Sequence, residues 1–334
     1  MWILKHLVIC YLLLLVPSLA TAKIVFRSFR DGGNNIYVMD DDGSNVQGLT
    51  FTPLPYIRPV WSPDGKRIAF VRITAKGGLG QREQSNLFLM NQDGSNVQQL
   101  TNHPSLNGLC TWAPDGHRIA FSSNRNGGLD IYVIDILTRE IQQLTRNPGL
   151  RKWAAGPSWS PDGKHIAYRQ ALPPRGLTTI YVMRSNGTAA HPLVPSDDWY
   201  RYGPRWSLDS KSVLYCESLY GPGEQGQVVR LLSSRVVIQR HGAKERQVLK
   251  TPKKWLIHSA AWLDNGKQVL IAADEYGAPD RQIDIYRYHL ATGALTNLTN
   301  HPEDDLAPDW ISDAVLSVTP SGEKKITQWG TLKK

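Results

Sequence analysis

The sequence is poor in cysteine and has only one long apolar run. Three of its 334 residues are cysteines, and one of them, Cys10, lies inside that run. Cys110 and Cys216 remain for the rest of the chain. A scaffold of this length has core enough without disulfides, so we expect none, although the sequence leaves a Cys110–Cys216 bridge open.

The apolar run has the layout of an export signal. Lys5 precedes it, the run extends from Leu7 to Val16, and the small residues Ala20-Thr-Ala22 follow. A membrane span needs ~20 apolar residues, more than this run supplies. We therefore predict a signal peptide at residues 1–22, cleaved after Ala22, and a periplasmic or secreted chain with no transmembrane segment after cleavage.

Several sequence signals of catalysis are missing. There is no Gly-x-Ser-x-Gly motif, which excludes a serine hydrolase domain of the α/β class. The nine histidines include no His-x-x-x-His pair. Asp40-Asp-Asp-Gly43 looks like part of a calcium loop but lacks the downstream glutamate, so a hairpin turn is favoured. We expect no catalytic residues, no metal and no cofactor.

Basic residues outnumber acidic ones. The chain has 38 Lys and Arg against 29 Asp and Glu, a formal net charge of +9, and a basic cluster lies between Arg235 and Lys254. Such a surface favours anionic partners or simply aids solubility. Because we expect export, nucleic acid is not the expected partner.

A phrase that opens with tryptophan occurs six times at nearly even spacing. The copies are Trp61-Ser-Pro-Asp-Gly65, Trp112-Ala-Pro-Asp-Gly116, Trp159-Ser-Pro-Asp-Gly163, Trp206-Ser-Leu-Asp-Ser210, Trp262-Leu-Asp-Asn-Gly266 and Trp310-Ile-Ser-Asp-Ala314. This period indicates a propeller or a linear array. An apolar triplet such as Ile68-Ala-Phe70 follows most copies, so a strand, a tight turn and a second strand form a hairpin.

Each repeat contains two further strands. Runs such as Ile36-Tyr-Val-Met39 have strand composition, and Asp42-Gly-Ser-Asn45 is a tight turn that leads to a short strand ending in Leu-Thr. Four strands per repeat describe a blade of a propeller. The sequence therefore predicts an all-β, six-bladed β-propeller of four-stranded antiparallel blades over residues 23–334.

The two ends of the chain are expected to close the ring. Residues 24–40 align with residues 119–135, so the chain after the signal starts at the second strand of a blade. The strand around Trp310 has no hairpin partner and is the candidate to complete that sheet. Closure avoids exposed strand edges.

These repeated phrases resemble the six-bladed propeller of the TolB family, over essentially the whole chain after the signal. The resemblance implies a periplasmic protein that binds partners of the Tol-Pal envelope system through its propeller. TolB proteins also carry an α/β domain ahead of the propeller. Here the propeller follows the predicted signal directly, so we expect a TolB-like propeller without that domain.

The connections between blades vary more than the turns and lead into the innermost strands, where functional loops gather. We expect their last residues to ring one mouth of the central channel and to bind a partner through aromatic and polar groups. The predicted binding residues are Tyr56, Arg58, Asn107, Trp153, Trp199, Tyr200, Arg201, Tyr202, His258, Asp304 and Asp305.

The favoured hypothesis is a monomeric, non-enzymatic scaffold that binds an envelope or secreted protein, or an anionic glycan, at this mouth. The alternative is a polysaccharide-active enzyme of the lyase type with its site in the same mouth. That chemistry needs a base and usually a metal. His258, Asp304 and Asp305 are the only set that the mouth offers for it.

Overall fold

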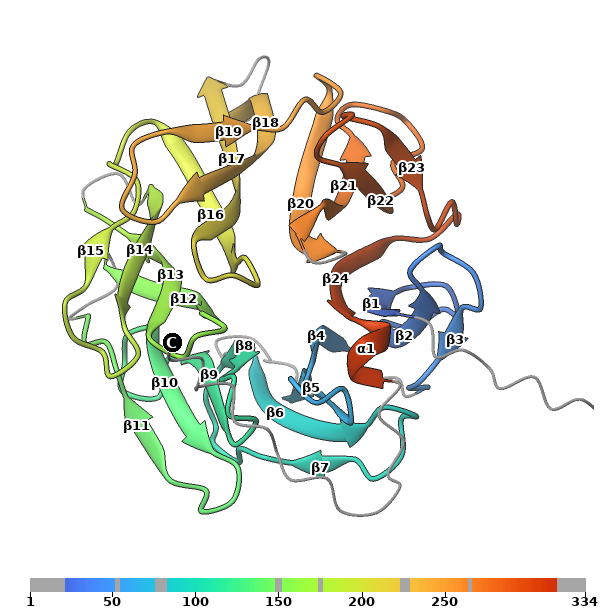
Figure 1. Ribbon diagram of the computed structural model, residues 1–334. Coiled ribbons are helices and arrows are strands. Elements are labelled where there is room, and N and C mark those ends of the chain that lie inside the picture. The colour runs from blue at the N-terminus through green and yellow to red at the C-terminus, as the bar shows by residue number, and fades with distance from the viewer. Residues whose placement is uncertain are drawn as a thin grey trace, which may run out of the picture.

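The computed structural model describes residues 22–51, 55–75, 83–147, 152–173, 177–222, 229–263 and 266–316. Within them the chain forms six four-stranded antiparallel sheets arranged as blades around a central axis (Figure 1). This confirms the predicted six-bladed β-propeller. The predicted signal peptide lies outside the described residues except for Ala22, as does the part of the predicted domain after Leu316.

Each blade contributes one strand to each of four concentric positions. The innermost strands are β4 (Tyr56–Trp61), β8 (Asn107–Trp112), β12 (Trp153–Trp159), β16 (Trp199–Trp206), β20 (Trp255–Leu263) and β24 (Asp305–Ile311). The second strands are β1 (Lys23–Ser28), β5 (Arg67–Ala75), β9 (Arg118–Ser123), β13 (His165–Ala171), β17 (Ser212–Pro222) and β21 (Gln268–Glu275). The third strands are β2 (Asn35–Asp40), β6 (Gln84–Asn91), β10 (Asp130–Asp135), β14 (Thr178–Arg184), β18 (Val229–Arg240) and β22 (Asp284–His289). The outer strands are β3 (Gln47–Gly48), β7 (Gln98–Gln99), β11 (Ile141–Gln143), β15 (His191–Pro192), β19 (Arg246–Val248) and β23 (Leu295–Asn297).

The ring closes through its two ends. β24 pairs antiparallel with β1, with Lys23 opposite Ile311 and Ser28 opposite Asp305, and the sheet order is β24-β1-β2-β3. The predicted pairing of the Trp310 strand with the N-terminal strands is therefore confirmed. This pairing leaves no unpaired inner strand edge at the junction, which such folds avoid.

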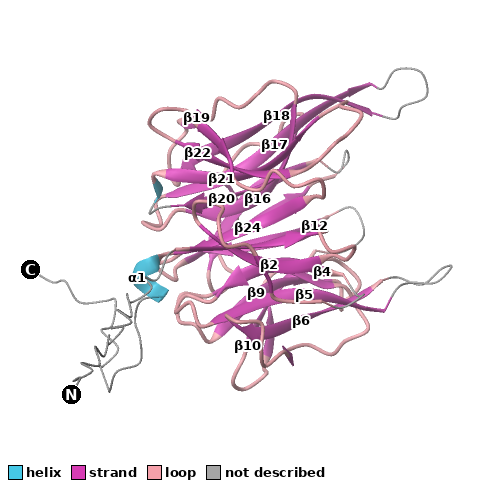
Figure 2. Cartoon of the chain, turned by 90° about the vertical axis from the view of Figure 1, so that its right-hand side faces the viewer, coloured by secondary structure: helices cyan, strands magenta, loops and turns pink. Residues whose placement is uncertain are grey.

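The two faces of the ring differ. The short helix α1 (Asp313–Leu316) lies at one face, and the long β17–β18 hairpin extends beyond the opposite face (Figure 2). Among the described residues, no helix is long and apolar enough to cross a membrane.

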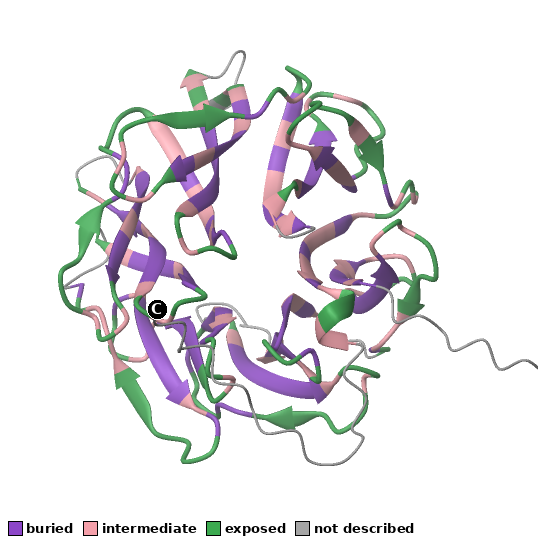
Figure 3. Cartoon of the chain, viewed as in Figure 1, coloured by how far each residue is buried: buried purple, intermediate pink, exposed green. Residues whose placement is uncertain are grey.

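The apolar core lies between neighbouring blades. Ile68 and Phe70 of β5 pack with Val25 and Ile36 of the preceding blade in one cluster. The second and third strands are buried along most of their length, while the outer strands are exposed (Figure 3). Each sheet therefore buries both faces against its neighbours, as the alternation of apolar residues in a propeller requires.

The repeated Leu-Thr ending of the outer strands has a hydrogen-bonding role. Thr101 Oγ1 accepts the backbone N–H of Leu87 at 3.0 Å and donates to Asn86 Oδ1 at 2.9 Å. Thr145 makes the corresponding bonds with Ile131 and Asp130. The threonine thus satisfies a backbone donor of the third strand that the short outer strand does not pair with.

The repeat tryptophans pack between blades. Trp112 Nε1 donates to the carbonyl of Val60 in the preceding blade at 3.3 Å, and the guanidinium of Arg67 lies 5.2 Å from the Trp112 ring centroid. Arg118 and Trp159 repeat the stacking one blade further. The tryptophans therefore serve the interfaces of the ring, although the ends of their strands also border the channel.

Candidate functional site

The central channel is walled by the six innermost strands, and each carries a β-bulge three or four residues before its tryptophan. In five strands the bulge holds a residue with positive φ: Arg58 (48°), Leu109 (47°), Gly156 (63°), Gly203 (61°) and Ala307 (51°). In β20 the register shifts at His258. A bulge bends its strand and redirects a side chain, so the repeat places a redirected residue on the channel wall in every blade.

Strand alternation divides the predicted binding residues between two faces. Four of them stand five residues before the repeat tryptophan, a position whose side chain is buried in each case. They are Tyr56, Asn107, Arg201 and Asp305. The structure therefore places these four side chains in the interior of the protein. The binding site proposed below does not include them.

Three of these residues have structural partners. The Asn107 amide donates to Ser85 O at 2.9 Å, and its Oδ1 accepts from Arg125 Nη2 at 2.8 Å. The Asp305 carboxylate accepts from Arg30 Nη2 at 2.9 Å, and burial raises its pKa. Tyr56 lies against the Phe70 ring, with centroids 5.4 Å apart.

Arg201 belongs to a buried ion network. Its guanidinium donates to Glu217 Oε2 at 3.0 Å and to Asp197 Oδ2 at 2.7 Å, and both Arg201 and Glu217 are fully buried. Arg235 Nε donates to Glu217 Oε1 at 2.7 Å, and the Arg235 guanidinium stacks 3.9 Å from the Trp199 ring centroid. Trp199 therefore lies on the same side of β16 as this network.

Three of the remaining predicted residues, Trp153, Tyr200 and Tyr202, lie near the starts of β12 and β16, and we call them, together with Arg169 of β13, the loop-side mouth. The Arg169 guanidinium lies 4.6 Å from the Trp153 ring centroid and donates to Tyr200 Oη at 3.1 Å. The Tyr200 and Tyr202 rings are 5.9 Å apart, and Tyr202 Oη lies 3.2 Å from Ser218 Oγ. All four side chains are half-buried, so each keeps surface that a partner can contact.

The residues of the lyase alternative do not converge. His258 Nε2 lies 2.8 Å from Asp274 Oδ1, and Asp274 also binds Arg281. Asp304 Oδ1 accepts the backbone N–H of Ile283 at 3.0 Å, while Asp305 is paired with Arg30. Within the described part of the chain, no three His, Cys, Asp or Glu side chains are grouped as metal ligands. The arrangement holds each of the three groups in its own structural contact and does not bring them together.

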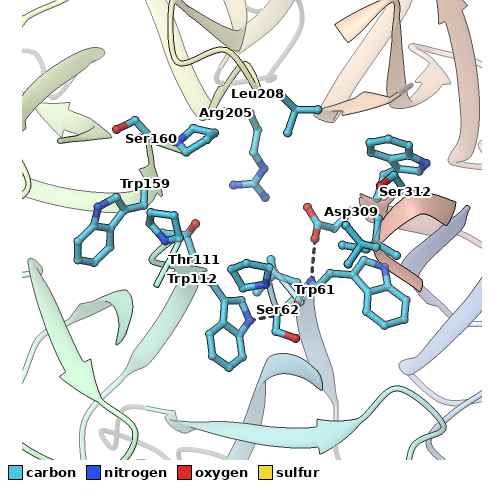
Figure 4. Close-up of a pocket in the computed structure, with 17 residues that line it drawn as sticks. Trp61, Ser62, Thr111, Trp112, Trp159, Ser160, Arg205, Leu208, Asp309 and Ser312 are labelled. Carbon is cyan, nitrogen blue, oxygen red and sulfur yellow. Dashed lines mark hydrogen bonds between the residues drawn. The ribbon is translucent and has the colours of Figure 1, made fainter. Parts of the chain in front are cut away.

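The opposite end of the channel, here the turn-side mouth, contains a pocket of about 320 Å³. The tryptophans and prolines of the repeat phrases line it: Trp61, Pro63, Trp112, Pro114, Trp159, Pro161 and Trp310. Arg205 of β16 and Asp309 of β24 extend into it (Figure 4). Our sequence reasoning missed this pocket, although the Trp-x-Pro ends of the inner strands mark it.

Comparison with known proteins decides the family. A family model described as the TolB beta propeller domain, PD40, matches residues 21–231. The chain belongs to this family. Its curated relatives include the Tol-Pal system protein TolB of Alcanivorax borkumensis, 28% identical over 115 residues, which are 34% of this chain and 25% of the relative. Another is the Protein TolB homolog of Chlorobium chlorochromatii, 33% identical over 155 residues, 46% of this chain and 32% of the relative.

Solved structures share the TolB-type fold. The crystal structure of TolB from Acinetobacter baumannii matches with a TM-score of 0.68 and 20% identity, covering 86% of this chain and 66% of that one. The hydrazine synthase of Kuenenia stuttgartiensis matches with a TM-score of 0.65 and 18% identity, covering 87% and 47%. The alignments span only about a quarter to a third of the length of the two TolB relatives named above.

Two buried cysteines of this TolB-family propeller lie near the channel. Cys110 on β8 and Cys216 on β17 are both unpaired, and burial raises the pKa of each thiol to about 12. A thiol held protonated in this way is a poor nucleophile and a poor metal ligand. These two thiols therefore add no reactive group to the channel wall.

Proposed function

We propose that this chain is an exported, non-enzymatic scaffold that binds a protein partner of the bacterial envelope at the loop-side mouth of its channel. The observation that carries the proposal is the cluster of Trp153, Arg169 and Tyr200. Aromatic rings and arginine dominate the energetically important part of protein interfaces. The cluster combines aromatic rings and an arginine on a rigid framework of strands. Part of the surface of each side chain stays accessible to a partner.

Export and the envelope partner are supported by different observations. The predicted signal peptide at residues 1–22 supports passage across a membrane. Relatives with the same propeller are named as Tol-Pal system proteins, which supports a partner of that kind. A glycan with anionic groups is the second ligand class that aromatic rings beside a cation suit.

The test is a binding assay with residues 23–334 immobilised and the host's envelope fraction as the source of partner. Tyr200→Ala removes the exposed ring at the centre of the cluster, and we expect retention of the partner to fall about tenfold or more, as for a central interface residue. Trp199→Ala is the matched control, because Trp199 is the adjacent aromatic residue and lies against Arg235 instead.

Circular dichroism must show that both variants keep the wild-type spectrum. A protein that the wild type and Trp199→Ala retain and Tyr200→Ala loses supports the proposal and names the partner. Equal retention of the partner by the wild type and both variants would show that the partner does not bind at the loop-side mouth. Binding of acidic oligosaccharides in place of a protein would reassign the ligand class while keeping the site.

A further inference from the structure

Four arginines from four different blades lie on the two innermost rings of strands. Arg27 lies on β1, Arg58 on β4, Arg169 on β13 and Arg205 on β16. Arg58 occupies the bulge of its strand at φ 48°, a conformation that costs a non-glycine residue free energy. Its charge interacts with those of Arg205, Arg169 and Arg27, and only the axis of the ring brings these blades together.

These half-buried arginines lack the ion-pair partners that Arg201 and Arg30 possess, although Arg169 donates a hydrogen bond to Tyr200. Arg201 and Arg30 are bound to Glu217 and Asp305, whereas no described residue forms an ion pair with any of the four channel arginines. Nε of Arg27 and Nε of Arg205 are buried without a hydrogen-bond partner.

Like charges gathered in a confined channel repel one another, and unpaired buried donors are costly. Burial is the main cause that lowers the pKa of Arg58, to about 9, and the three neighbouring guanidinium groups add to it. Two carboxylates attract these arginines, Asp309 acting on Arg205 and Asp304 on Arg27, but neither forms an ion pair with them, and each is bound to a backbone N–H. Asp309 accepts the Trp61 backbone N–H at 2.8 Å and Asp304 accepts that of Ile283 at 3.0 Å.

We propose that the channel is an anion-binding site in which Arg58, together with Arg27, Arg169 and Arg205, holds a carboxylate or phosphate group. Guanidinium groups bind both anions through paired, charge-assisted hydrogen bonds. Ser259 stands at the equivalent position of β20, and its Oγ is buried without a partner, so it supplies a further donor. This site shares Arg169 with the loop-side mouth, but Arg27, Arg58 and Arg205 lie outside the aromatic cluster, so substitution of Arg58 tests the anion site by itself.

Two kinds of ligand supply a carboxylate or phosphate group: a free small anion, and an acidic side chain of a peptide that enters the channel. The test measures binding of inorganic phosphate and of a capped tetraglutamate peptide by isothermal titration calorimetry, with thermal unfolding at matched ionic strength. Tetraglutamine is the neutral peptide control. For the wild type, we expect a saturating ligand to raise the melting temperature by about 2 °C or more.

The decisive variant is Arg58→Leu, because Leu109 occupies the same bulge in the neighbouring blade and shows that leucine fits there. Arg184→Leu removes the same charge from an exposed position on β14 and is the matched control. We expect anion binding about tenfold weaker or more in Arg58→Leu, and unchanged in Arg184→Leu. Should Arg58→Leu fail to fold, Arg205→Ser replaces it, since Ser158 holds the equivalent position in β12.

Phosphate binding without peptide binding identifies a free anion as the ligand. Tighter binding of tetraglutamate, with phosphate as a competitor, identifies a carboxylate of a protein partner. The proposal is overturned if neither probe binds the wild type, or if Arg58→Leu and Arg205→Ser bind as tightly as the wild type. A failed pull-down at the loop-side mouth has no bearing on these measurements.

Discussion

The Asp309 carboxylate accepts the backbone N–H of Trp61 at 2.8 Å and thereby joins the last inner strand to the first. Ser158 makes the same bond to the backbone N–H of Trp206, at 3.1 Å, from the equivalent position of β12. In both cases the residue before one repeat tryptophan holds the backbone of the tryptophan in the next blade. The contact at Asp309 therefore reinforces the closure of the ring.

This relationship predicts different outcomes for two substitutions of Asp309. Asp309→Ser keeps a hydroxyl acceptor, as Ser158 does, while Asp309→Ala leaves the Trp61 N–H without one. We expect the serine variant to be more stable than the alanine variant by about 1 kcal/mol. Urea unfolding of both proteins measures the difference, and equal midpoints would show that the bond contributes nothing to closure.

The Asp-Gly turns predict a strong glycine requirement. Gly94 has φ +83°, and a Cβ there would lie 2.6 Å from the carbonyl oxygen of Leu49 in the preceding blade. Gly116 also has positive φ, +71°, but faces open space. Gly116→Ala should cost about 1–2 kcal/mol through its conformation alone, and Gly94→Ala clearly more. Thermal unfolding checks the order, and an equal loss in both variants would remove the blade contact as the cause.

The network around Glu217 predicts the largest stability effect. Glu217 is fully buried and binds Arg201, Arg235 and Arg246. Removing its charge by Glu217→Gln leaves the buried Arg201 with Asp197 as its remaining carboxylate partner, and we expect a loss of about 3–5 kcal/mol. Glu275→Gln is the control, because its pair with Lys254 is exposed and should be worth almost nothing. Denaturant unfolding compares the two, and similar midpoints would contradict the prediction.

A cluster of three histidines predicts acid sensitivity. The His241 ring lies 5.1 Å from that of His165 and 5.9 Å from that of His191, by centroids. Burial, then the charges of these neighbours, lowers the pKa of His241 below 6.5, while Asp162 acts in the opposite direction. The unfolded chain therefore binds a proton more readily than the folded one.

Stability should fall as the pH drops through 6.5 and below, and this site should add nothing at higher pH. His241→Gln should lose less stability than the wild type between pH 7.5 and pH 5. The free energy of unfolding, measured at several pH values in this range, provides the check. Parallel profiles for the two proteins would assign the acid sensitivity to other groups.

Part of the candidate site could be read from the sequence. The repeat located the inner strands, and Trp153, Tyr200, Tyr202 and His258 are half-buried in the structure. Counting back from each tryptophan in steps of two would have put Tyr200 and Tyr202 on the buried face with the tryptophan and Arg201 on the opposite face, the reverse of what the structure shows. The bulge in every inner strand interrupts the alternation that such a count assumes.

By itself the sequence determined the architecture, because a repeated phrase with strand, turn and strand chemistry leaves few alternatives to a ring of equivalent blades. Only the tertiary structure decided which side chains meet. Arg58 and Arg205 are far apart in the sequence, and no local pattern links them. Ring closure brings them to one axis, because every blade points its innermost strand at the same channel.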